Sequence, residues 1–264
     1  MPCARRRLRK KMSTTKALDA PGSRWRYFLL AAVAIGSLAL VFSLPPFDRD
    51  FQYRAFADRR VFFGIPNFWD VASNIPFLLV GIAGLKSCLG YDLRNGKLAW
   101  SVLFAGVAFV SVGSSYYHWD PEDATLLWDR LPMAIAFMGL FVALLGEYVS
   151  VRLAHILLVP MLLLGLSSVL YWRSFGDPRL YFWVQLIPLL TVPAVIVLFR
   201  ARYTRRSLLL AALGWYALAK VSELYDREIF AFTGNLFSGH SFKHVLAAMA
   251  CFTILWMLRT RKPL

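Results

Sequence analysis

Three of the four histidines in this chain lie in two short polar stretches, and their spacing could bind a metal ion. His118 directly follows a run of 20 uncharged residues, and four acidic side chains and Arg130 lie within residues 118–130. His240 and His244 are four residues apart at the start of the last apolar run, so on a helix they share one face. Two such histidines, with a third from another helix, leave the fourth tetrahedral position open, which is typical of a catalytic zinc site. Imidazole nitrogens also suit other divalent metals.

Two further polar residues are close to these histidines and are candidate catalytic groups. Ser114 precedes His118 by four residues and therefore lies on the same helical face. Asp129 is near the start of the next apolar run. Alone, Ser114 would be interpreted as a helix-packing serine, and Asp129 as a partner of Arg130 or a helix cap. The fourth histidine, His155, is expected to be an ordinary polar residue at the opposite membrane interface.

The composition is that of a membrane protein. Hydrophobic residues make up 58% of the chain and charged residues only 17%, whereas soluble proteins have roughly 25% charged residues. An apolar run of about 20 residues is long enough to cross the bilayer core as a helix. We therefore predict an all-α membrane protein, a seven-transmembrane-helix bundle with one additional N-terminal transmembrane helix. The seven predicted core spans are at about 67–89, 98–118, 129–149, 153–172, 180–200, 206–224 and 240–258.

Three segments are expected along the chain. Residues 1–26 are a basic cytoplasmic tail, residues 27–47 are the additional helix, and residues 48–264 are the seven-helix domain. The additional helix has no clear small-x-small cleavage site, so it is interpreted as an uncleaved span. The span at 206–224 is the weakest, because its charge-free core has only 13 residues.

The charge distribution predicts the orientation. A net charge of +15 could suggest a nucleic-acid partner, but 20 of the 30 Lys and Arg residues lie on one side of the membrane if the spans alternate from a cytoplasmic N-terminus. This is the positive-inside pattern, so topology explains the charge and no nucleic acid is expected. Both termini are then cytoplasmic, and all three clustered histidines lie at the extracytoplasmic face.

With these residues identified, the sequence resembles the alkaline ceramidase family over about residues 53–258. The family belongs to a wider superfamily of seven-span membrane proteins that includes the adiponectin-type receptors. The resemblance is carried by Ser114-x3-His118-x10-Asp129, by His240-x3-His244, and by Asn67-Phe-Trp-Asp70-Val-Ala-Ser73-Asn74.

The resemblance implies a function and a set of roles. It implies that His118, His240 and His244 hold Zn²⁺, and that Ser114 and Asp129 flank the reacting centre. It also implies hydrolysis of the amide bond of a ceramide-like lipid drawn from the membrane lipids, which gives a sphingoid base and a fatty acid.

The resemblance also raises the question of Ca²⁺. Animal members bind calcium through an acidic N-terminal segment and a glutamate that enters the first core helix. Here Asn67 stands at the position that resembles this glutamate, and Asp58 is nine residues earlier. Asp58 and Asn67 are the expected calcium residues, with Asp48, Asp50 and Asp70 as substitutes.

The sequence leaves one main alternative to hydrolysis and disfavours two others. The main alternative is a seven-span receptor or lipid-binding protein of the same superfamily with a structural zinc. An intramembrane serine protease is disfavoured, because Ser114 is near the end of its helix rather than at an N-terminus. A di-haem cytochrome is disfavoured, because His155 lies on the wrong side.

Overall fold

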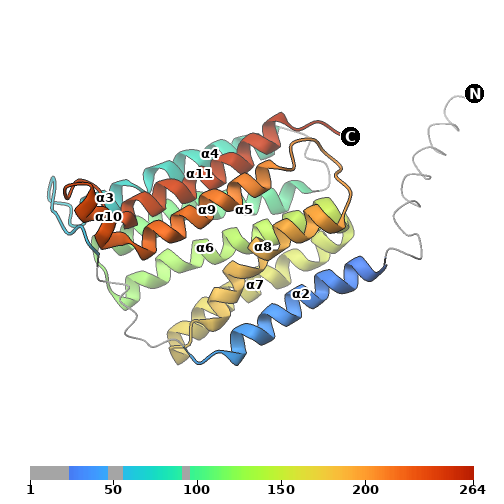
Figure 1. The fold of residues 1–264 in the computed structure, drawn as a ribbon, viewed down its shortest axis with the longest axis horizontal. Helices are drawn as coiled ribbons and strands as arrows, with labels where there is room; N and C mark the ends of the chain where they lie inside the picture. The colour runs from blue at the N-terminus through green and yellow to red at the C-terminus, as the bar shows by residue number, and fades with distance from the viewer. Residues whose placement is uncertain (1–23, 47–55, 91–95) are drawn as a thin grey trace, which may run out of the picture.

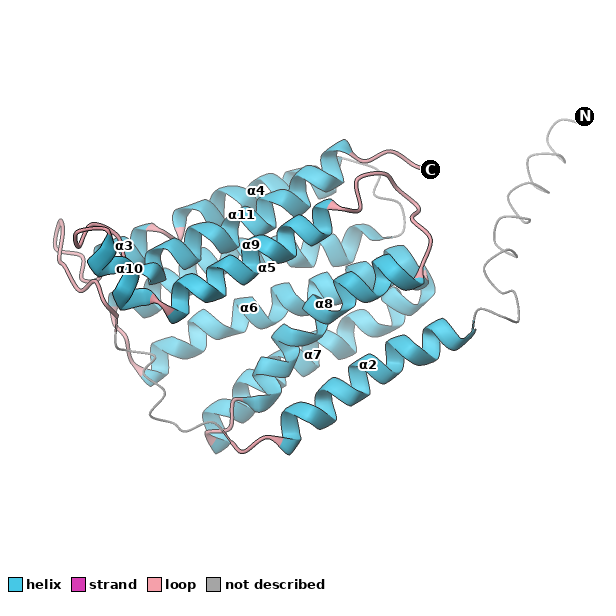
Figure 2. Ribbon diagram, in the orientation of Figure 1, coloured by secondary structure: helices cyan, strands magenta, loops and turns pink. Residues whose placement is uncertain are grey.

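The computed structural model describes residues 24–46, 56–90 and 96–264. Residues 1–23 of the basic tail and the acidic residues Asp48 and Asp50 lie outside the described residues. Within this described part, helices are the regular elements and no strand occurs (Figure 2). Only two isolated bridges add β-type pairing, between Phe62 and Ile65 and between Tyr203 and Pro263.

Ten α-helices are present in the described residues, and a π-helical turn, η3 (Leu145–Val149), continues the fifth of them. The helices are α2 (Arg24–Ser43), α3 (Phe68–Ala72), α4 (Ile75–Gly90), α5 (Lys97–Trp119), α6 (Asp123–Leu144), α7 (Val151–Phe175), α8 (Arg179–Leu198), α9 (Leu208–Leu224), α10 (Asp226–Phe232) and α11 (Gly239–Thr260).

Seven helical segments of the described chain are long and apolar enough to cross a membrane. They include α2 and the segment Phe68–Gly90, which combines α3 and α4. An eighth span forms only if α9 and α10 are counted together, and these two helices meet at a bend of 83°. The architecture confirms the predicted all-α bundle with an additional N-terminal helix, and the bent pair falls on the span predicted to be weakest.

The first and the last long helices of the core, α4 and α11, lie side by side (Figure 1). Helix α11 packs against α9 and α4, and α5 packs between α4 and α6. Helix α2 packs against α8 at the edge of the bundle (Figure 1). The end of α5 and the start of α11 therefore lie at the same end of the bundle, although they are far apart in sequence.

Two predicted spans differ from the observed helices in a way that affects the site. Helix α6 begins at Asp123 rather than near residue 129, because Glu122 and Thr125 form a capping box at its N-terminus. Asp129 consequently lies inside the helix and does not cap it. The first core span is interrupted between α3 and α4, where the Asn74 side-chain amide donates to the Asp70 carbonyl oxygen at 2.8 Å.

Candidate metal centre

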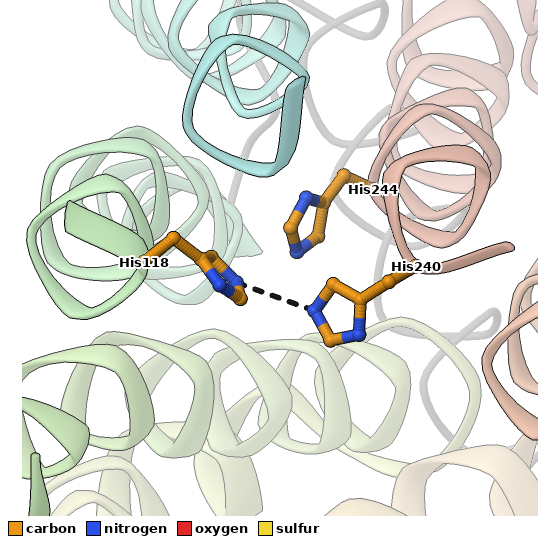
Figure 3. A group of neighbouring side chains, drawn as sticks. All are labelled: His118, His240 and His244. Atoms are coloured by element: carbon orange, nitrogen blue, oxygen red, sulfur yellow. Dashed lines mark hydrogen bonds between the residues drawn. The ribbon is translucent and has the colours of Figure 1, made fainter. Parts of the chain in front are cut away.

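The three predicted histidine ligands converge on one point (Figure 3). His118 extends from the last turn of α5, while His240 and His244 extend from the first turns of α11. One ring nitrogen from each histidine lies within 4.8 Å of those of the other two. His118 and His244 are almost completely buried, and His240 is partly exposed. The tertiary structure therefore forms the cluster that the spacing predicted.

The nitrogen positions fit a metal ion. The Nε2 atoms of His118 and His240 lie 3.3 Å apart. Two nitrogens bound to one tetrahedral zinc at about 2.0–2.1 Å would be roughly 3.3–3.4 Å apart, so this pair needs little movement to share an ion. Three neutral imidazoles with no thiolate are a donor set that suits zinc and leaves a fourth position open.

A hydrogen bond orients His244. Its Nδ1 atom lies 2.8 Å from the Ser73 hydroxyl oxygen, and the Ser73 hydroxyl donates to the Asp70 carbonyl oxygen at 3.2 Å. Because the Ser73 proton is used in that bond, the Ser73 oxygen can accept a hydrogen bond from the N–H group at His244 Nδ1. The Nε2 lone pair of His244 is then free to bind a metal, as outer hydrogen bonds do for metal-binding histidines.

The backbones that carry His118 and His240 are also fixed by side chains from distant segments. The Asn67 side-chain amide donates to the His118 carbonyl oxygen at 2.8 Å. The His240 amide donates to Asp226 Oδ1 at 2.7 Å, and Asp226 Oδ2 accepts from the Ala57 amide at 2.9 Å. Helix α10 and the loop before α3 thus hold the start of α11 in place.

Asp70 anchors the same helix from inside the bundle. Its carboxylate is fully buried and accepts hydrogen bonds from the hydroxyls of Ser241 at 2.6 Å and Ser238 at 3.2 Å. The Ser238 hydroxyl oxygen also accepts from the Ser241 amide at 3.0 Å and so caps α11. Sequence reasoning considered Asp70 only as a calcium substitute, whereas the structure places it in the support of the histidine helix.

The two candidate catalytic residues are buried on neighbouring helices. Ser114 lies one turn before His118 on α5, and Asp129 lies on α6. The helices approach closely beside them: a Cβ atom at Gly113 would be 2.0 Å from the Trp128 carbonyl oxygen. Asp129 Oδ2 also lies 3.4 Å from Arg130 Nε, so the expected pairing with Arg130 is present together with the location beside the histidines.

Two cavities adjoin this site. A polar cavity of about 590 Å³ is lined by His118, His240 and Asp129, among other residues. A smaller apolar cavity of about 120 Å³ lies among α4, α5, α6, α8, α9 and α11. Tyr216 lines the apolar cavity and donates a hydrogen bond at 3.2 Å to Gln185, which lines the polar one. The site can therefore offer a polar compartment next to a hydrocarbon-lined one.

The polar cavity also contains an ionic cluster whose connection to the histidines was missed. Lys220 and Glu223, three residues apart on α9, form a local ion pair. Glu223 also pairs with Lys243 at 2.8 Å, and Lys243 Nζ lies 3.1 Å from His240 Nε2. The helical spacing of residues 240, 243 and 244 could have revealed Lys243, since all three share one face.

The proposed calcium residues have other partners. Arg60 donates to both carboxylate oxygens of the buried Asp58, at 2.8 Å and 2.6 Å, and this hydrogen bonding raises the pKa of Arg60. The Asn67 amide nitrogen is bonded to His118, as described above. Among the described residues, the histidines form the only group of three or more potential metal ligands, and the calcium site stays a prediction.

The remaining histidine is separate from the cluster. His155 is exposed near the start of α7, where it was expected at the membrane interface. It therefore provides a natural comparison residue for the three clustered histidines.

Comparison with known proteins identifies the family. The model of the Ceramidase family matches residues 61–262, which contain the three clustered histidines, Ser114 and Asp129. The search of curated proteins found no match. The matched region begins after α2 and extends to the end of the last helix, so it covers the site and the helices that support it. Family membership supports an amidohydrolase that acts on ceramide. The chain belongs to the Ceramidase family.

Proposed function

We propose that this protein is a zinc-dependent hydrolase that cleaves the amide bond of ceramide-like lipids within the membrane. The observation that carries the proposal is the convergence of three imidazoles beside a polar cavity that is lined by His118, His240 and Asp129, with Ser114 one turn before His118. The family assignment supports ceramide as the substrate class. The products are a sphingoid base and a fatty acid.

His118, His240 and His244 would hold the zinc ion. A zinc ion at such a site lowers the pKa of bound water to about 7 and polarises carbonyl groups. The chain itself contributes burial, because two of the three rings are almost fully shielded. It also contributes orientation through Ser73, Asn67 and Asp226.

Asp129 and Ser114 then act on the reacting atoms. Asp129 takes a proton from the attacking water and returns it to the nitrogen of the leaving amine as the carbon–nitrogen bond breaks. Ser114 donates a hydrogen bond to the carbonyl oxygen, which gains negative charge as the water oxygen bonds to the carbon. Arg130 lies 3.4 Å from the Asp129 carboxylate and helps to position it.

The lipid tails supply most of the binding energy. Each buried methylene contributes roughly 0.8 kcal/mol, so a long chain placed among the helices outweighs the polar contacts of the headgroup. The apolar cavity offers such surroundings, with Phe77, Met133 and Tyr216 among its lining residues. Phe77 also lies near His244, with ring centroids 6.4 Å apart, so this cavity reaches the metal site.

A direct assay separates hydrolysis from lipid binding. Purified protein in lipid nanodiscs should release sphingoid base from labelled ceramide, lose this activity with a zinc chelator and regain it when zinc is restored. A receptor or lipid-binding protein with a structural zinc would bind ceramide and contain zinc, but would release no sphingoid base. That result in fully zinc-loaded protein would refute the proposed reaction.

We also propose that the site faces the extracytoplasmic side, with both termini in the cytoplasm. The support is the distribution of basic residues, 20 of 30 on the side opposite the histidines. In a background without the native cysteines, single cysteines placed among residues 119–128, at the end of α5 and the start of α6, should react with an impermeant thiol reagent in intact cells. Cysteines placed among residues 201–206 should react only after lysis, and the reverse pattern would overturn the orientation.

A further inference from the structure

Lys243 is a charged residue at the cavity wall to which the reaction described above assigns no role. It lies on α11, on the same face as His240 and His244, and its side chain is only 19% exposed. Its ammonium nitrogen is 2.8 Å from Glu223 Oε1 and 3.1 Å from His240 Nε2. Lys243 is thus held beside the metal-binding nitrogen by a carboxylate from α9.

One carboxylate is shared between two ammonium groups in this cluster. Glu223 Oε1 accepts from Lys243, while Oε2 accepts from Lys220. Lys220 is about half exposed, whereas Lys243 faces the interior of the cavity. The cluster therefore carries a surplus of one positive charge, and Lys243 is the member placed beside the histidines.

The other acidic groups deeper in the cavity have ion-pair or hydrogen-bond partners other than Lys243. Asp129 pairs with Arg130, and both oxygens of Asp226 accept backbone amides. Arg227 and Glu228 also line the cavity, where both side chains are exposed. Among the described residues, the carboxylate that pairs directly with Lys243 is that of Glu223.

Binding of a metal changes what Lys243 can donate to. The Nε2 atom of a neutral imidazole has one lone pair, so it cannot bind a metal and accept a hydrogen bond from Lys243 together. With the metal bound, one N–H group of Lys243 needs a new acceptor. An ammonium group and a divalent cation that lie close together also repel each other, and an anion between them relieves the repulsion. The arrangement favours a negatively charged oxygen at this point.

We propose that Lys243 is a further catalytic residue that binds the acyl oxygen of the substrate as it gains negative charge, and then the carboxylate of the released fatty acid. The inference rests on the proposed function, because it takes the fatty acid to be a product. In that reaction one water is consumed, the carbon–nitrogen bond breaks, and an amine and a carboxylic acid result. The acid ionises near neutral pH, so its carboxylate gives Lys243 an anionic partner.

The test measures binding of the product rather than turnover. Zinc-loaded protein in nanodiscs is titrated with palmitate and with hexadecanol at mildly alkaline pH, each displacing a fluorescent fatty acid. The two ligands have the same chain length and differ in charge. Wild-type protein should prefer palmitate by about tenfold to a hundredfold, the range expected for a hydrogen bond between charged groups.

Matched variants assign that preference to one side chain. Lys243→Met should lower the preference for palmitate at least tenfold and leave hexadecanol binding unchanged, and it leaves Glu223 paired with Lys220. Lys243→Arg should retain a large part of the preference, because it keeps the charge. Lys220→Met is the control, since it removes the other partner of Glu223 and should keep the preference.

The outcomes separate this inference from the proposed function. If Lys243→Met keeps the wild-type preference, or Lys220→Met loses it equally, then Lys243 does not bind the carboxylate. If the protein discriminates through Lys243 but zinc-loaded protein releases no sphingoid base, the anion site stands and the proposed hydrolysis fails. If it hydrolyses ceramide while Lys243→Met discriminates as strongly as the wild type, the hydrolysis stands and the inference about Lys243 fails.

Discussion

The two ends of the helix bundle both bury charged or metal-binding side chains, but they arrange them differently. At the histidine end, where α5 finishes and α11 begins, the ring nitrogens converge (Figure 3), and His118 and His240 line a polar cavity. At the opposite end, Glu147 of η3 pairs directly with Arg261, and their side chains are only 8% and 6% exposed. The Arg261 guanidinium also lies 4.2 Å from the ring centre of Tyr203.

This difference shows that burial of charge does not by itself identify a functional site. At the opposite end the charges satisfy each other, so that pair fastens η3 to the end of the chain. At the histidine end, Ser73, Asn67 and Asp226 hold the three histidines so that one ring nitrogen of each lies at a common centre. Changes at the first end should therefore alter turnover, whereas changes at the second should alter stability.

The largest expected effect is on His240. His240→Ala removes a ligand, and because changes in outer contacts alone cost 10–100-fold in affinity or activity elsewhere, the loss of zinc and of turnover should be more than a hundredfold. Zinc per chain by elemental analysis, about one in the wild type, is the measurement. His155→Ala is the matched control and should change neither quantity. Full zinc content in His240→Ala would remove this histidine from the site.

Asp129→Asn should have the next largest effect on turnover. The amide keeps the size of the side chain but cannot accept a proton from water, so the rate should fall by about 10²–10⁴ while zinc content is unchanged. Asp123→Asn, at the exposed start of the same helix, is the control. Near-normal rates for Asp129→Asn at every pH would exclude Asp129 from proton transfer.

Ser114→Ala should be milder. Removal of a hydrogen-bond donor to a developing oxyanion has cost about 2.7–4 kcal/mol elsewhere, which corresponds to a rate decrease of about 10²–10³. Zinc content and ceramide binding should stay at wild-type values. Ser115→Ala is the adjacent control: it loses a 3.1 Å hydrogen bond to the Val71 carbonyl oxygen, so it should affect stability more than rate. Equal rates for the two variants would argue against an oxyanion role for Ser114.

The smallest effect on turnover is expected at the opposite end. Glu147→Met leaves Arg261 buried without its partner, which should cost about 3–5 kcal/mol and lower the unfolding midpoint by roughly 10 °C. Zinc content and turnover per folded molecule should be unchanged. The double variant Glu147→Met/Arg261→Met should recover much of the stability, since neither charge is then left unpaired. A zinc defect in Glu147→Met would contradict the independence of the two ends.

Much of the fold could be predicted from the sequence, because a bilayer imposes a minimum length on every apolar helix. The long apolar runs and the side preference of Lys and Arg depend only on local composition. The start of α6 could not be placed this way, because the capping box of Glu122 and Thr125 extends the helix beyond its apolar part. The bend between α9 and α10 likewise falls where the apolar core of a predicted span was too short.

For the site, the sequence by itself determined which residue types could bind a metal. It also determined that His240 and His244, which are four residues apart, share one face of a helix. Only the tertiary structure decided that α5 and α11 meet with their ring nitrogens facing each other. It also brought Glu223 of α9 against Lys243, beside His240 of α11. These contacts join residues far apart in the chain, and their distances depend on how the helices pack, which no local pattern specifies.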